Sequence, residues 1–298
     1  MAKPGLPEAN PATRAGGGLG GRPRAISSEE LARILAAHRL YVETDRRRGA
    51  RGDLRGAELT GRDLSGAKLR RIRLDHALLR DVRLTGADLR RANLAGADLS
   101  GAGLAGADLG GARLSGTILT ATNLEGADLA GADMEFATMV RGALPRARLT
   151  EADLSGANLE NADLAEADLC EANLRGARLR QARLDGTTLR GARLGGAVLE
   201  SASLRQADLR DAYLRGADLR QADLRGAILS GAKLADADLT GANLFKAAID
   251  GADLARANLV GVRFLNCAQL TGARNWPSAA REPDLACGAP IPPVGDGP

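Results

Sequence analysis

Aromatic side chains are scarce in this sequence. Its 298 residues include three Phe, two Tyr and one Trp, although 44% of the residues are hydrophobic. The core of an ordinary globular protein of this length uses more aromatic volume, so small aliphatic side chains must fill the interior here. This composition favours a repeat architecture.

Cysteine and histidine are also in short supply. The three cysteines, Cys170, Cys267 and Cys287, are widely spaced and include no pair at metal-ligand spacing, so the sequence argues against a disulfide framework. His38 and His76 are the only imidazoles, and no nucleophile motif accompanies them. We interpret both as surface or interface residues. The sequence therefore predicts no enzyme, no cofactor and no metal site.

Long apolar runs are missing as well. No segment approaches the ~18 apolar residues of a membrane-spanning helix, and residues 1–25 lack the apolar region of a signal peptide. We therefore expect a cytoplasmic protein with no membrane partner. The net charge of +4 is too small to identify an anionic partner. Composition leaves the partner, the physiological role and the oligomeric state open.

A period of five residues runs without interruption from Leu54 to Phe264. Of its 43 central positions, 39 are Leu, and the others are Met134, Met139, Ile249 and Phe264. The residue two before the centre is Ala in 34 repeats, and the residue directly before it is Asp or Asn in 21. The residue two after the centre is Gly in 22 repeats.

This period excludes both regular secondary structures. A step of five residues along an α-helix rotates by ~140°, which scatters the leucines around the helix. In a straight strand, residues five apart point to opposite faces. The pattern is satisfied when the chain turns a corner in every repeat, with glycine supplying the turn. Four right-angle corners give about 20 residues per coil, and coils about 4.8 Å apart give a rod of about 50 Å.

The A(D/N)LxX repeats over residues 52–264 resemble the pentapeptide-repeat family. The resemblance implies an all-β fold, a right-handed quadrilateral β-helix, with the central Leu and the preceding Ala inside. We expect the following centres, among others, to form the structural core: Leu54, Leu89, Leu129, Leu169, Leu209 and Leu254.

The rod needs covered ends, because bare coils expose unpaired strand edges. Ser27 and Glu30 form a capping box that starts a helix from residue 28 to about 44. Its apolar stripe predicts a lid on the N-terminal end of the rod. The stripe consists of Leu31, Ile34, Leu35 and Val42.

We predict five segments along the chain. Phe264, Leu265, Leu270 and Trp276 are expected to plug the C-terminal end of the rod. The segments are a disordered tail (1–25), the capping helix with a basic linker (26–51), the β-helix (52–264), a C-terminal cap (265–276) and a second disordered tail (277–298).

Two departures from the repeat carry structural expectations. Arg62 occupies an inward position, where an unpaired charge is costly, so we expect it to leave the first coil toward the lid helix. Pro145 lacks a backbone donor and predicts a bend or bulge nearby.

The outward positions carry charge in bands. Residues 92–174 contain 13 acidic and 4 basic residues, and residues 175–225 contain 11 basic and 6 acidic residues. With a 20-residue coil, Asp88, Asp108 and Asp128 form a column of like charges that repel each other. These three aspartates are candidate partner contacts.

The outward positions also include an apolar spot within the acidic band. Ile118 and Thr138 stack 20 residues apart, Val140 shares the side of Thr138, and Phe136 lies at the corner before it. Exposed apolar clusters mark partner contacts, so these four residues are the second set of candidates.

The main functional hypothesis is a non-catalytic binding or scaffold protein with a protein partner. The resemblance implies an alternative, because some family members mimic DNA, bind type II topoisomerases such as gyrase and protect them from quinolones. Band 92–174 is the only part acidic enough for this role. A third hypothesis is nucleic-acid binding through band 175–225 and the segment Arg46–Arg51, which predicts strong salt dependence.

Overall fold

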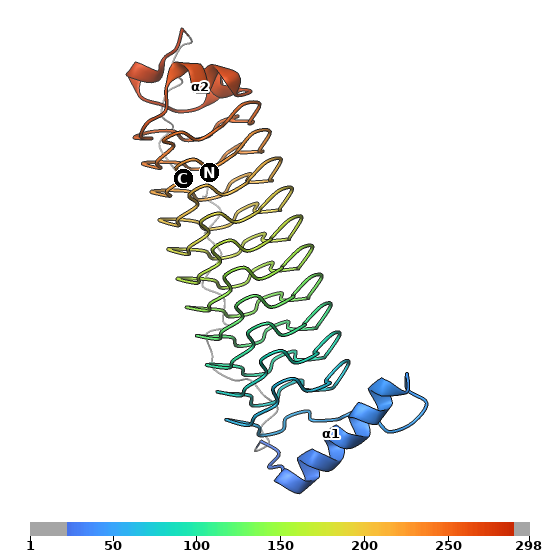
Figure 1. The fold of residues 1–298 in the computed structure, drawn as a ribbon. Helices are drawn as coiled ribbons and strands as arrows, with labels where there is room; N and C mark the ends of the chain where they lie inside the picture. Colours follow the sequence, from blue (N-terminus) through green and yellow to red (C-terminus); the bar gives the residue numbers. More distant parts are fainter. Residues whose placement is uncertain (1–22, 289–298) are drawn as a thin grey trace, which may run out of the picture.

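Stacked coils of backbone form an elongated rod (Figure 1). The computed structural model describes residues 23–288. Parallel β-bridges join residues 20 apart, from Asp53–Arg73 through to Asn243–Arg263. The right-handed quadrilateral β-helix and its coil length are therefore confirmed.

The four sides of the rod are numbered here by their outward residues, which directly precede the centres. Side 1 starts at Asp53, side 2 at Glu58, side 3 at Asp63 and side 4 at Lys68, and each continues in steps of 20 residues. Sides 2 and 4 are opposite sides of the square, and so are sides 1 and 3.

Backbone hydrogen bonds show why the repeat has five residues. The amide of Leu89 donates to the carbonyl of Asp108 in the next coil (2.7 Å), and the amide of Asp88 donates to Ala67 in the preceding coil (3.0 Å). At each corner the central carbonyl accepts from the amide three residues later, as in Ala92 to Leu89 (2.9 Å). The residue before that donor has a positive φ, which is the geometry of a type II turn and explains the frequent glycine there.

The outward Asp or Asn stabilises the same turn. Oδ1 of Asp128, for example, accepts from the amide of Ala130 (2.9 Å), and this donor position takes no part in the ladder. Pro145 occupies such a donor position after Ala143, which has no side-chain acceptor. No bond is lost, and the bridges on either side, Asn123–Ala143 and Asp128–Arg148, remain regular. The bend expected at Pro145 is therefore absent.

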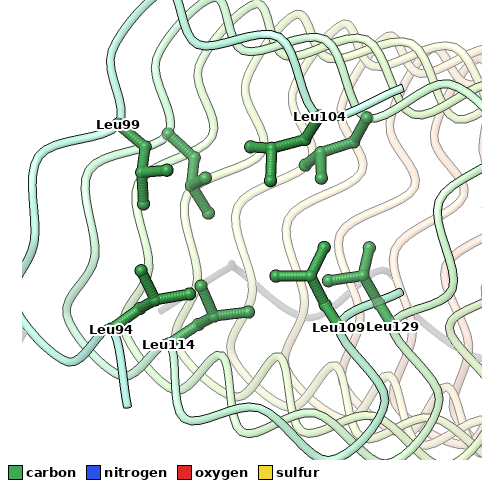
Figure 2. A pocket seen from close by; sticks show the side chains of 8 residues that line it. Leu94, Leu99, Leu104, Leu109, Leu114 and Leu129 are labelled. Atoms are coloured by element: carbon green, nitrogen blue, oxygen red, sulfur yellow. The ribbon is translucent and has the colours of Figure 1, made fainter. Parts of the chain in front are cut away.

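Leucine and alanine fill the bore of the rod. Figure 2 shows leucines of different sides, such as Leu94 and Leu104, pointing into it, and the space between them leaves no room for a water molecule. The six centres named above as core are all buried, at 0–2% exposure. Where threonine replaces alanine, its hydroxyl donates to a carbonyl, as Thr117 does to Leu94 (3.0 Å).

Helix α1 (Ser28–Glu43) covers the N-terminal end (Figure 1). Oγ of Ser27 caps it by accepting from the amide of Glu30 (3.0 Å). Arg62 leaves its inward position and donates to Oγ of Ser28 (2.8 Å), as expected from the cost of burying its charge. Arg24 pairs with the open edge of side 2 through a parallel bridge to Ala57.

His38 belongs to this lid rather than to the surface. It is fully buried on α1, and its Nδ1 accepts from the amide of Gly52 (3.0 Å). Burial and the nearby Arg51 lower its pKa, so the neutral imidazole is favoured. The helical spacing places His38 on the stripe of Leu31 and Ile34, a signal that the sequence contains. His76 is exposed, as expected.

The C-terminal cap extends further than the sequence suggests. Helix α2 (Cys267–Gly272) is followed by the 3-10 helices η2 (Trp276–Ser278) and η3 (Pro283–Leu285). Between them the chain bridges the top edges of sides 1 and 2, at Asp253–Arg274 and Asn258–Ala280. Residues 277–288 therefore take a defined path where disorder was expected. Of both predicted tails, residues 1–22 and 289–298 lie outside the described residues.

A disulfide between Cys267 and Cys287 closes this cap, with 5.4 Å between the two Cα atoms. The expectation of no disulfide is wrong, because the chain folds back over the rod and brings these two residues together. Cys170 is free.

The residues that plug the C-terminal end of the rod also differ from those predicted. Leu265 and Leu270 are buried and Trp276 is partly buried, whereas Phe264 is 62% exposed, because the chain leaves the coil there. Arg281, 2% exposed, lies over the Trp276 ring and donates to the carbonyls of Ala279 and Leu285. Desolvation lowers the pKa of this guanidinium.

We expect Cys267→Ser to lower the free energy of unfolding of the C-terminal cap. The disulfide closes a loop with a sequence separation of 20 residues, for which the chain-entropy model gives about 3 kcal/mol. Thermal unfolding measured with and without a reductant checks this. Cys170→Ser is the control and should respond to reductant like the parent chain. Equal melting of reduced and oxidised parent protein would contradict the prediction.

Candidate partner-binding surface

The predicted apolar spot lies on side 2 and its two corners. Ile118 is 41% exposed and forms a parallel bridge with Thr138, which is half-buried. Phe136 is 59% exposed at the corner between sides 1 and 2, and Val140 is half-buried just before the next corner. Ile118 and Thr138 are therefore ladder neighbours, and Phe136 and Val140 precede and follow Thr138 along the chain.

Phe136 owes its position to the coil above. Its φ of 55° is left-handed, and a Cβ placed on Gly156 would come within 2.5 Å of the phenyl ring. Glycine at 156 thus lets the ring lie along the corner. The ring presents its outer face to solvent.

The predicted aspartate column lies on side 4, opposite the apolar spot. Bridges Asp88–Asp108 and Asp108–Asp128 confirm the stacking. Arginines neutralise it, however, because Arg90 pairs with Asp88 (2.6 Å) and Asp108 (3.2 Å), and Arg148 pairs with Asp128 (2.9 Å). One flat partner surface cannot contact both this column and the apolar spot.

Most of the basic band is neutralised as well, and only Arg175, Arg190 and Arg193 of its arginines have no ion pair with any residue in the range 23–288. Five arginines that wind around the rod each have a carboxylate partner. The pairs are Arg205–Asp223 (2.6 Å), Arg210–Asp208 (2.5 Å), Arg215–Asp236 (3.1 Å), Arg220–Asp218 (2.6 Å) and Arg225–Asp223 (2.7 Å). These ion pairs reduce the net positive charge that the five guanidinium groups present to phosphates.

The acidic band keeps much of its charge. Seven of its carboxylates have no ion pair with any residue in the range 23–288. They are Asp133, Glu135, Glu151, Asp153, Glu166, Asp168 and Glu171. Glu135 and Asp133 flank Phe136 on side 1, so the apolar spot borders an anionic surface.

A second exposed apolar pair lies near the C-terminal end. Phe245 is 43% exposed and packs edge-on against Phe264, with 5.4 Å between ring centroids. The sequence pattern predicted Phe264 as a plug residue, and its packing against Phe245 was not predicted. The 20-residue register was the available signal, since it places residues 245 and 264 in neighbouring coils.

Within residues 23–288, no group of three or more His, Cys, Asp or Glu is arranged to hold a metal ion. No helix in that range is long and apolar enough to cross a membrane.

A four-sided rod with a bore of stacked leucines defines the class of quadrilateral β-helix repeat proteins. The family model described as pentapeptide repeats (8 copies) matches most of the rod. The matched residues are 77–116, 107–141, 147–186, 182–221, 207–244 and 237–274. The chain therefore belongs to the pentapeptide-repeat family. No curated protein sequence matches it.

One solved structure, HetL, gives the same assignment. HetL from the cyanobacterium Nostoc sp. strain PCC 7120, a pentapeptide repeat protein involved in heterocyst differentiation regulation, is 36% identical over 76% of this chain and 96% of HetL, with a TM-score of 0.63. Rfr23 from the cyanobacterium Cyanothece 51142 is 37% identical over 30% of this chain and 58% of its own, with a TM-score of 0.24. The fluoroquinolone resistance protein QnrB1 is 19% identical over 68% and 91%, with a TM-score of 0.32.

Asp223 provides a test of the neutralised basic band. Burial acts to raise its pKa, but hydrogen bonds from Arg225 and Arg205 outweigh burial and lower the pKa to about 2. Because the folded value lies below the ordinary value of about 3.9, these pairs stabilise the fold above pH ~4 and lose their effect as the pH falls toward 2.

We expect Asp223→Asn to lower the free energy of unfolding at pH 7 by on the order of 1–2 kcal/mol, with a difference from the parent that shrinks between about pH 4 and 2. Denaturant unfolding across this range measures it. Asp168→Asn, at a carboxylate without an ion pair, is the matched control. A difference that is independent of pH would refute the assignment.

Proposed function

We propose that this protein is a non-catalytic binding protein whose rod presents the apolar spot of side 2 to a protein partner. The observation that carries the proposal is the exposure of two large apolar side chains, Ile118 on side 2 and Phe136 at its corner, with an anionic surface bordering Phe136. Large exposed apolar side chains at the centre of a polar surface are typical of interaction hot spots.

The rigidity of the rod supports this role. Phe136 stands on a corner held by ladder hydrogen bonds, such as its amide to the carbonyl of Ser155 (3.0 Å). A partner therefore binds a preorganised surface and little ordering entropy opposes association. HetL, of which this chain covers 96%, is involved in regulating differentiation, and a regulatory role through protein binding fits the same architecture.

The disulfide of the C-terminal cap bears on the cytoplasmic location expected from the sequence. A protein disulfide such as Cys267–Cys287 persists in oxidising compartments and is rare in the cytosol. It argues against the cytoplasmic location inferred from composition.

We expect the double variant Phe136→Asp and Val140→Asp to abolish capture of the partner from an extract of the source cells. Aspartate tolerates the left-handed backbone at 136, so the fold should remain intact by circular dichroism. Phe245→Asp, which removes an exposed phenyl ring elsewhere, is the matched control and should still capture the partner. If the double variant still captured the same partner, the proposal would be wrong.

A second candidate is DNA mimicry by the acidic band, favoured by its seven carboxylates without ion pairs. If this candidate holds, the purified protein inhibits supercoiling by gyrase, and Glu151→Lys with Glu171→Lys weakens the inhibition. The control is Asp88→Asn, because that carboxylate is already neutralised by Arg90. No inhibition at high molar excess ends this candidate.

A further inference from the structure

Side 1 leaves its charges unpaired over most of the rod. Eight consecutive outward residues are joined by parallel bridges. They are Arg113, Asp133, Asp153, Asn173, Arg193, Tyr213, Lys233 and Asp253. None of the six charged residues in this column has an ion pair with another residue of the described range 23–288. Other sides pair such charges vertically, as Asp163 and Arg183 do on side 3 (3.1 Å).

The order of charges along this column is unfavourable at one step, although Arg113 with Asp133 and Lys233 with Asp253 are ladder neighbours of opposite charge. Asp133 and Asp153 are neighbours about 4.8 Å apart along the ladder, and like charges at that spacing repel. The hydrogen bonds to Asp153 come from neutral groups, the Ser155 amide and hydroxyl and the Asn173 amide, so its charge is not neutralised. Tyr213, 53% exposed, separates the two cations Arg193 and Lys233.

The same order becomes favourable when the column faces a reversed copy of itself. A two-fold axis midway between Asn173 and Arg193 sets each residue against a complementary one of the second copy. The facing pairs are Asn173 with Arg193, Asp153 with Tyr213, Asp133 with Lys233, and Arg113 with Asp253. Each pair occurs twice, as in any isologous interface.

We propose that side 1 is a self-complementary surface through which two copies of this chain pack antiparallel, side by side. In three of the four kinds of pair, a charge faces a hydrogen-bonding partner or an opposite charge across the interface. The fourth, Asp153 with Tyr213, gives the exposed phenol a charged acceptor.

The register of this dimer is specific. A slip of one coil in one direction sets Arg113 against Lys233, and a slip in the other sets Asp133 against Asp253. Each slip also sets Asp153 against a cation, Arg193 or Lys233, but both slips lose the two opposite-charge pairs of the proposed register, so both are disfavoured. At the rim, Glu171 would lie near Arg190 of the second copy and Glu151 near Asp211, but solvent-exposed charges contribute little in either direction.

The size of the surface predicts a weak dimer. Seven steps of about 4.8 Å give a contact roughly 34 Å long, and a side of three to four residues is about 10–13 Å wide. About 400 Å² per copy is below the range of stable complexes, so association depends on charge and on concentration. We expect dimers at low ionic strength that dissociate as salt rises.

Sedimentation velocity on the purified full chain tests the proposal at about 0.02 M and about 0.5 M NaCl, where the Debye length falls several-fold. Asp133→Lys alone and Lys233→Asp alone should each weaken dimerisation by more than about tenfold. The two together should restore it, because the facing pair is only reversed. This restoration is not expected of a structural defect.

Two controls isolate the register. The first is the double variant Asp153→Lys with Lys233→Asp, which makes the same charge exchange with the aspartate one coil away. It should stay monomeric, because Asp133 of one copy then faces the new aspartate at position 233 of the other. Glu166→Lys changes an unpaired carboxylate at another corner and should keep the dimer. The parent chain tests salt dependence without any substitution, so a variant that fails to fold does not remove the test.

A parent protein that is monomeric at low salt up to its solubility limit overturns the proposal, and so does a dimer that neither salt nor the charge exchange affects. The Phe136→Asp and Val140→Asp variant should dimerise normally. Failure of the dimer and failure of the partner site on side 2 are therefore separate outcomes.

Discussion

Each coil of the rod buries its leucines only against the coils above and below it, and this stacking depends on one constraint. Every coil must contain the same number of residues, because a single extra residue would turn each following leucine toward solvent. The bridges between residues 20 apart run unbroken from Asp53 to Arg263 and show that the constraint holds along the whole bore. Nearest-neighbour stacking then makes the rod stable as a sum of coil interfaces.

The same register determines the surface. Because the bore holds leucine and alanine at fixed positions, each outward residue is placed directly over the one 20 positions earlier. Columns such as Ile118 and Thr138, or Asp133 and Asp153, are consequences of packing inside the rod. The surface differs between sides mainly in whether neighbouring charges neutralise each other. The two proposed binding surfaces lie where they do not, on side 1 and around Phe136.

The two ends of the rod cover their open strand edges in different ways. At the N-terminal end an amphipathic helix covers the bore, and Nδ1 of His38 accepts a hydrogen bond from the amide of Gly52. At the C-terminal end an irregular segment pairs with sides 1 and 2, and a disulfide holds its end in place. Both caps pair part of the terminal ladder with the chain itself, which leaves fewer strand edges for other rods.

The periodic part of this molecule could be predicted because its structure depends on residues close together in sequence. The five-residue pattern of Leu and Ala determines the geometry of one corner, and the same pattern recurs in every coil of the rod. The lid helix and the exit of Arg62 followed from capping and charge. The partners of individual arginines could not be predicted, since Arg90 can reach several carboxylates and only side-chain packing selects among them. The disulfide was missed because Cys287 follows an aperiodic segment, whose path depends on contacts with the finished rod.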